Sequence, residues 1–171
     1  MSAWDRQAEL WIVGHRVAVL NPLFEALSFI GTFALVWMVI AAGFAVARRM
    51  RTAVVIAAAA ITAEVTTDAL KLLFDRARPT VDALVHRPAS GSFPSGHSAT
   101  SFACATVIAG LEPRFRIAAF ALAGGIAASR LYVGVHYPTD VVAGAAWGVA
   151  IGLSAISLMR RSTDLSTVEG S

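Results

Sequence analysis

The chain has 171 residues, of which 57% are hydrophobic and 15% charged, and its mean hydropathy is +0.67. An ordinary soluble domain carries about 25% charged residues, so this chain has too little polar surface to coat a water-facing globule. The formal charge is only +3, and the sequence contains no basic block or basic-aromatic stripe, so nothing in it indicates a nucleic-acid partner. Its single cysteine, Cys104, excludes an internal disulfide framework. These properties favour an integral membrane protein.

The segment 1–20 precedes the first long apolar stretch and is amphipathic. Apolar and aromatic side chains recur in it at three- and four-residue spacing: Trp4, Ala8, Trp11, Ile12 and His15. This spacing predicts a helix lying in the membrane interface, with Trp4 and Trp11 as anchors. A disordered tail is the alternative.

Five apolar segments follow, and a bilayer-spanning helix needs roughly 20 such residues. The segments predicted to span the membrane are residues 26–47, 53–74, 97–111, 116–132 and 139–159. Residues 160–171 are polar and are predicted to form a loose tail. The expected architecture is all-α: one domain over residues 1–171, with about five transmembrane helices and an interfacial helix.

Small residues in the last of these segments predict close helix packing. Gly144, Gly148 and Gly152 form two overlapping G-x-x-x-G pairs, which let neighbouring backbones approach closely.

The predicted spans divide the loops between two sides of the membrane. One side carries seven arginines: Arg48, Arg49, Arg51, Arg114, Arg116, Arg160 and Arg161. The other side has as many basic residues, but Lys71, Arg78 and Arg130 belong to the polar clusters described next. The positive-inside rule then places the arginine-only side in the cytoplasm and loop 75–96 outside it. The alanine and arginine bias is typical of GC-rich bacterial coding, so we expect a bacterial cytoplasmic membrane.

Three polar clusters lie on the side of loop 75–96. They are Lys71 to Arg78-Pro79, Pro94-Ser95-Gly96-His97, and Ser129-Arg130 through His136 to Asp140. An even number of crossings separates them, so all three reach one membrane face. Placing several charged side chains at a membrane boundary costs free energy. Their presence there therefore indicates a functional site.

The cations of these clusters point to a phosphate ligand. Lys71, Arg78 and Arg130 lack a matching set of acids, and such a group suits an anion with several oxygens. Ser95 and Gly96 stand at a predicted helix start, where free backbone N–H groups favour an anion. Asp68 lies about one turn before Lys71 and Glu64 about two turns before it, and both are interpreted as its counter-charges, with a proton relay as the alternative.

The two histidines of the clusters suit nucleophilic catalysis. His136 and Asp140 are four residues apart, so the carboxylate can hold one ring nitrogen while the other faces phosphorus. His97 is then the acid for the departing oxygen and later the base for water. The spacings match no metal site, and three cations would repel a metal ion, so no metal or cofactor is expected.

The three clusters closely resemble the signature of the type 2 phosphatidic acid phosphatase (PAP2) superfamily, K-x6-R-P, P-S-G-H and S-R-x5-H-x3-D. Every signature position in residues 71–140 holds the family's residue at the family's spacing. Many membrane members have six spans, whereas this sequence predicts five and an interfacial helix.

The resemblance implies a metal-independent phosphatase with a phosphohistidine intermediate. His136 would attack phosphorus, Asp140 would orient it, and His97 would protonate the leaving group. The phosphoryl oxygens would be held by Lys71, Arg78, Ser95, Gly96 and Arg130.

The expected substrate is a membrane lipid phosphate or polyprenyl pyrophosphate. The resemblance implies polyprenyl pyrophosphate, phosphatidylglycerophosphate or phosphatidic acid as candidate substrates, and the alanine and arginine bias adds decaprenyl-phosphoryl-ribose phosphate for a mycobacterial source. Loop 75–96 is the only sizeable extramembrane segment of the predicted topology, so a small headgroup is expected. Transfer of the phosphoryl group to an alcohol is one alternative, and a non-enzymatic lipid-phosphate binder or transporter is another. The oligomeric state is open.

Overall fold

The computed structural model describes residues 3–168, with the side chains of residues 3–161. Its helices are α1 (Ala3–Gly14), α2 (Asn21–Ile30), α3 (Leu35–Val46), α4 (Met50–Phe74), α5 (Gly96–Leu111), α6 (Arg116–Tyr132) and α7 (Pro138–Val168). Short 3-10 turns, η1 (Ala18–Leu20), η2 (Thr32–Ala34) and η3 (Pro113–Phe115), join some of them. The described chain contains no strand, so the expected all-α class is confirmed.

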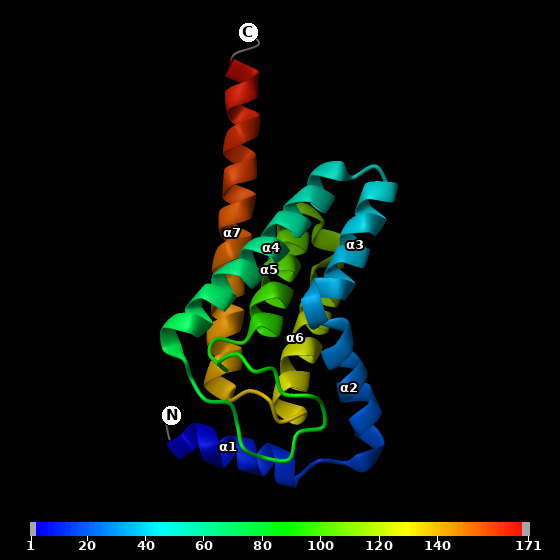
Figure 1. Cartoon of the computed structure of the whole chain (residues 1–171). Coiled ribbons are helices and arrows are strands. Elements are labelled where there is room, and N and C mark those ends of the chain that lie inside the picture. The colour runs from blue at the N-terminus through cyan, green and yellow to red at the C-terminus, as the bar shows by residue number, and fades with distance from the viewer. Residues whose placement is uncertain (1–2, 169–171) are drawn as a thin grey trace.

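Helix α5 is the centre of the bundle. It packs against α4, α6 and α7, while α3 packs on α4 and α2 on α6. Eleven of the 16 residues of α5 are buried, and small side chains such as Ala99 and Ala103 let its neighbours approach. Helix α1 crosses the lower end of the bundle, next to the loop that connects α4 to α5 (Figure 1).

The predicted glycine contact lies between α5 and α7. A Cβ atom on Gly148 would stand 2.1 Å from the carbonyl oxygen of Ala99, and one on Gly144 would stand 2.4 Å from that of Ser95. These distances are well below van der Waals contact, so the two backbones pack directly on each other. The G-x-x-x-G prediction is confirmed.

The expected single helix over residues 26–47 is wrong. The chain breaks between α2 and α3, where Phe33 and Ala34 adopt left-handed backbone angles and the two halves bend by 66°. Left-handed residues cost about 1–2 kcal/mol each. Gly31 lies so close to Ile126 and His97 that a Cβ would come within 2.7 and 2.9 Å of them. Tertiary contacts therefore hold a bend that the apolar composition does not indicate.

The count of five spans is not confirmed by helix length. Met50–Phe74 and Pro138–Arg161 are long and apolar enough to cross a membrane, and the bent pair Ala18–Ile30 with Thr32–Val46 would make a third. Helices α5 and α6 have 16 and 17 residues, at the lower limit of a span. The chain is a membrane-type helical bundle.

The two ends of the chain differ in part from expectation. Helix α1 has the predicted amphipathic form: Trp4 and Trp11 are exposed, whereas Asp5 and Glu9 are buried against the bundle. Helix α7 continues to Val168, although a loose tail was expected from residue 160. No glycine or proline interrupts residues 160–168, so the helix has no stop signal there. Residues 1–2 and 169–171 lie outside the described part.

We predict that Gly148→Ala destabilises the protein. The added methyl group meets the α5 backbone, and overpacking of this kind costs about 1–3 kcal/mol or more. Thermal unfolding in detergent measures the effect. Gly124→Ala is the matched control, because a Cβ on this α6 glycine meets nothing within 4 Å and should stabilise the helix. Equal melting temperatures of the two variants would contradict the packing role of Gly148.

Candidate active site

Six of the eight residues predicted for the site line one cavity of about 590 Å³. They come from α4, the loop 75–95, the start of α5, the end of α6 and the α6–α7 turn: Lys71, Arg78, Gly96, His97, Arg130 and His136. The other two, Ser95 and Asp140, are fully buried and do not line the cavity. The fold thus brings all three sequence clusters to one place.

Asp140 lies behind His136, on the side away from the cavity. Its Oδ2 is 3.5 Å from His136 Nδ1 and accepts a hydrogen bond from the backbone N–H of Tyr137 at 2.9 Å. The carboxylate is therefore fixed by the first turn of α7 and faces the ring nitrogen turned away from the cations. This placement agrees with an orienting role.

The other ring nitrogen of His136 faces Arg78. Arg78 Nη1 lies 3.1 Å from His136 Nε2 and also donates to the carbonyl of Val135 at 3.0 Å. Burial lowers the pKa of the His136 ring well below its ordinary value, and neighbouring cations, first Arg130 and then Arg78, lower it further. A neutral ring keeps the lone pair on Nε2 that a nucleophile needs.

His97 is held by the end of α2 and by the turn η2 that follows it. Its Nε2 lies 3.2 Å from the carbonyl oxygen of Ser28 and 3.5 Å from Thr32 Oγ1. Arg130 donates to the hydroxyl of the same Ser28. The sequence reading missed Ser28 and Thr32, although two hydroxyls at i and i+4 in an apolar stretch mark one helix face.

Lys71 lies near the end of α4, and its ammonium group lies beside Gly96 at the start of α5. A Cβ on Gly96 would stand 3.4 Å from Lys71 Nζ, so the missing side chain leaves room for the ammonium group. Lys71 pairs with Asp68 at 2.8 Å, in agreement with the counter-charge interpretation, whereas Glu64 accepts from Thr100 at 3.1 Å. The Lys71 side chain is 12% exposed and faces the cavity from α4.

Ser95 is the N-cap of α5. Its hydroxyl accepts hydrogen bonds from the backbone N–H and the hydroxyl of Ser98, at 3.4 and 3.1 Å. Its own N–H donates to the carbonyl of Asp140 at 2.9 Å. Ser95 therefore joins the starts of α5 and α7, and its contact with phosphate stays a prediction.

Arg76 is the main residue that the sequence reading missed. It donates to Asp140 Oδ1 at 2.5 Å and to Asp5 Oδ2 at 2.7 Å. Asp5 in turn accepts from the backbone N–H of Thr139 at 3.1 Å and from its hydroxyl at 2.8 Å. Burial by itself raises the pKa of Asp5, but the hydrogen bonds from Thr139 and Arg76 outweigh it and lower this pKa. Helix α1 is thereby tied to the carboxylate behind His136.

The chemistry of the cavity suits an anion. Within residues 3–161, no cluster of three histidine, cysteine or acidic side chains has the geometry of a metal site. Three cations instead surround the two imidazoles, an arrangement that attracts phosphoryl oxygens.

The model of the PAP2 superfamily matches residues 50–164. The chain belongs to the PAP2 superfamily. This PAP2 protein is 35% identical over 133 residues to the decaprenylphosphoryl-5-phosphoribose phosphatase of Mycobacterium tuberculosis, which covers 75% of this chain and 74% of that one. It is 48% identical over 62 residues to the lipid A 1-phosphatase of Rhizobium johnstonii, covering 36% of this chain but only 25% of that longer protein.

Two solved structures share the fold of this chain. The transmembrane phosphatidylglycerolphosphate phosphatase of Bacillus subtilis has a TM-score of 0.80 at 26% identity, over 93% of this chain and 86% of that one. LpxE of Aquifex aeolicus has a TM-score of 0.81 at 25% identity, over 91% and 96% of the two chains. The likeness covers more than nine tenths of this chain and so extends beyond the matched family region of residues 50–164.

We predict that the His136 ring stays neutral at pH 6.5, where an unperturbed imidazole is about half protonated. NMR titration of histidine-labelled protein in micelles measures this, with His136→Gln to assign the signal. Arg78→Ala removes one of the cations and should raise the His136 midpoint. A midpoint at or above 6.5 in the unmodified protein would refute the electrostatic description of the site.

Proposed function

We propose that the chain is a metal-independent membrane phosphatase that hydrolyses a lipid phosphate or polyprenyl pyrophosphate through a phosphohistidine. One observation carries the proposal: His136, with the Asp140 carboxylate behind Nδ1 and Arg78 beside Nε2, lines the same cavity as Lys71, Arg78 and Arg130. Binding alone would need the cations but neither histidine.

In the first step, the three cations hold the non-bridging oxygens while His136 Nε2 attacks phosphorus. The P–N bond forms as the bond to the leaving oxygen breaks, and His97 gives that oxygen its proton. In the second step, His97 takes a proton from water, whose oxygen attacks the phosphohistidine. The P–N bond breaks and inorganic phosphate leaves. Fixed cations favour both steps because they stabilise the charge that gathers on the phosphoryl oxygens.

Apolar residues at the cavity support a lipid rather than a soluble substrate. Phe33 and Leu72 line the cavity and are 88% and 85% exposed. Phe33 lies in the break between α2 and α3, and Leu72 lies near the end of α4. A lipid chain can cover these side chains while its phosphate reaches His136.

The headgroup is proposed to be small. The cavity of about 590 Å³ lies within the usual range for small ligands, about 300–1,000 Å³. The similarity to the mycobacterial phosphatase extends over about three quarters of both chains, which favours decaprenyl-phosphoryl-ribose phosphate as the specific substrate. The structural similarity to the Bacillus subtilis phosphatase favours phosphatidylglycerophosphate as the alternative.

The proposed topology has five passes in the bacterial cytoplasmic membrane: the bent α2–α3 pair, α4, α5, α6 and α7. Helix α1 lies in the interface on the extracytoplasmic side, where the cavity opens. The arginines of the α3–α4 and α5–α6 connections, at the other end of the bundle, support this orientation.

The first test is phosphate release by the purified protein in EDTA. The panel contains polyprenyl pyrophosphate, polyprenyl phosphoribose phosphate, phosphatidylglycerophosphate and phosphatidic acid. We expect release without metal, complete loss in His136→Ala, and a loss of about 10²–10⁴-fold in His97→Ala. His15→Ala is the control, because this exposed histidine contacts Trp11 away from the cavity.

Two results would contradict this function. Activity lost in EDTA and restored by Mg²⁺ would exclude the metal-independent mechanism. If the unmodified protein and His136→Ala bind lipid phosphate equally well and neither releases inorganic phosphate, the protein is a binder or transporter.

Arg76 is expected to act as a positioning residue for the Asp140 carboxylate. Arg76→Gln should lower kcat with little change in KM, because Arg76 contacts Asp140 but does not line the cavity. The pH profile should shift as well, since the carboxylate behind His136 loses its charged partner. Arg6→Gln, on the exposed face of α1, is the control. A change in KM alone would instead assign Arg76 to substrate binding.

A further inference from the structure

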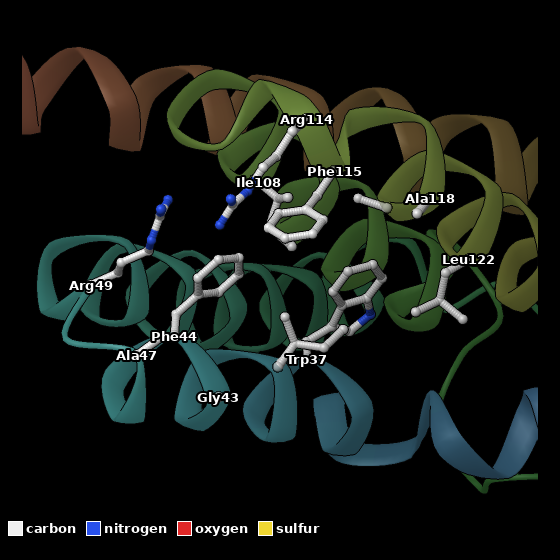
Figure 2. Close-up of a pocket in the computed structure, with 12 residues that line it drawn as sticks. Trp37, Gly43, Phe44, Ala47, Arg49, Ile108, Arg114, Phe115, Ala118 and Leu122 are labelled. Carbon is white, nitrogen blue, oxygen red and sulfur yellow. The ribbon is translucent and has the colours of Figure 1, made fainter.

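A second cavity, of about 400 Å³, lies toward the other end of the bundle between α3, α5 and α6 (Figure 2). Apolar side chains make up most of its lining, among them Trp37, Ile40, Phe44, Ile108, Phe115 and Leu122. Ile108 is 11 residues beyond His97 on α5, about 16 Å along a helix that rises about 1.5 Å per residue. This cavity is therefore separate from the active site.

The interior of the cavity suits a hydrocarbon chain. The rings of Phe44 and Phe115 pack edge to face with centroids 5.9 Å apart. Trp37 is fully buried, and its indole N–H already donates to Ser101 Oγ at 3.0 Å. The wall formed by these rings therefore offers no free donor to a polar ligand.

Two arginines line one end of the cavity, and the apolar residues extend away from them (Figure 2). Arg49 pairs with Glu112, which also accepts from Thr52 at 3.2 Å. The Arg114 guanidinium lies over the Phe115 ring, 4.5 Å from its centroid, and has no carboxylate partner among residues 3–161. One cation at the mouth is thus available to a ligand.

The surrounding segments add further positive charge. Arg48, Arg51 and Arg116 flank the same two connections, and Glu112 is the single acid in residues 47–52 and 111–117. This excess of cations repels a second copy of the same surface. It also disfavours a zwitterionic headgroup, which carries a cation of its own.

We propose that this cavity binds an anionic phospholipid, with one acyl chain between α3 and α6 and the phosphate on Arg114 beside Arg49. Basic pockets between membrane helices recognise anionic headgroups through such charge, and guanidinium groups pair well with phosphate oxygens. The lipid would link α3 to α6 from the side opposite the active site. It is a ligand of the bundle and not a substrate, since its phosphate lies at the end of the bundle opposite His136.

The test compares phosphatidylglycerol with phosphatidylcholine of the same acyl chains. Native mass spectrometry of the full chain, released from detergent with saturating inorganic phosphate, measures the bound lipid. We expect retention of phosphatidylglycerol and about fivefold weaker retention in Arg114→Ala, the effect of one surface cation. Arg160→Ala, an exposed arginine that does not line the cavity, should leave retention unchanged.

A second variant fills the cavity without touching the arginines. Gly43 lines it, and a Cβ there meets nothing within 4 Å, so Gly43→Leu should reduce retention without unfolding the protein. Gly124→Leu is the matched control on α6, because its Cβ is equally unobstructed and lies outside the cavity.

Three results would overturn the proposal: equal retention of both lipids, equal losses in Arg114→Ala and Arg160→Ala, or a dimer that Gly43→Leu abolishes. No turnover is measured, so these outcomes are independent of the proposed phosphatase activity.

Discussion

The direct contact between the starts of α5 and α7 is the constraint on which the site depends. Gly144 lets the α7 backbone reach the carbonyl of Ser95, and the N–H of Ser95 donates to the carbonyl of Asp140. These contacts place the P-S-G-H cluster beside the cluster that ends at Asp140. A side chain in place of the glycine would move His97 and His136 apart, so the spacing of the two imidazoles is set by a backbone contact.

The buried charges around this contact are held by partners from several elements. Arg76 connects Asp140 to Asp5 of α1, and Ser28 of α2 contacts both Arg130 and His97. Each pairing reduces the penalty of removing a charge from water, which a lone buried ion would incur in full. The N-terminal segments therefore complete the site, although the three sequence motifs lie in residues 71–140.

The two ends of the bundle carry cations in different settings. At one end, Lys71, Arg78 and Arg130 surround histidines in a polar cavity, which suits chemistry on phosphate. At the other, Arg49 and Arg114 border an apolar cavity without a nucleophile, which suits binding only. The same guanidinium group thus serves two purposes, and the difference comes from what lies beside it.

The sequence by itself determined the helical class, the glycine contact in the last helix and six residues of the cavity, because hydropathy and motif spacing are local. Only the tertiary structure decided the bend at Phe33 and Ala34, the bond from Arg76 to Asp140 and the docking of Asp5. In each case the partner is distant in the chain: Gly31 meets Ile126, and Asp5 meets Thr139. No local pattern encodes such contacts, since they exist only after the helices have packed.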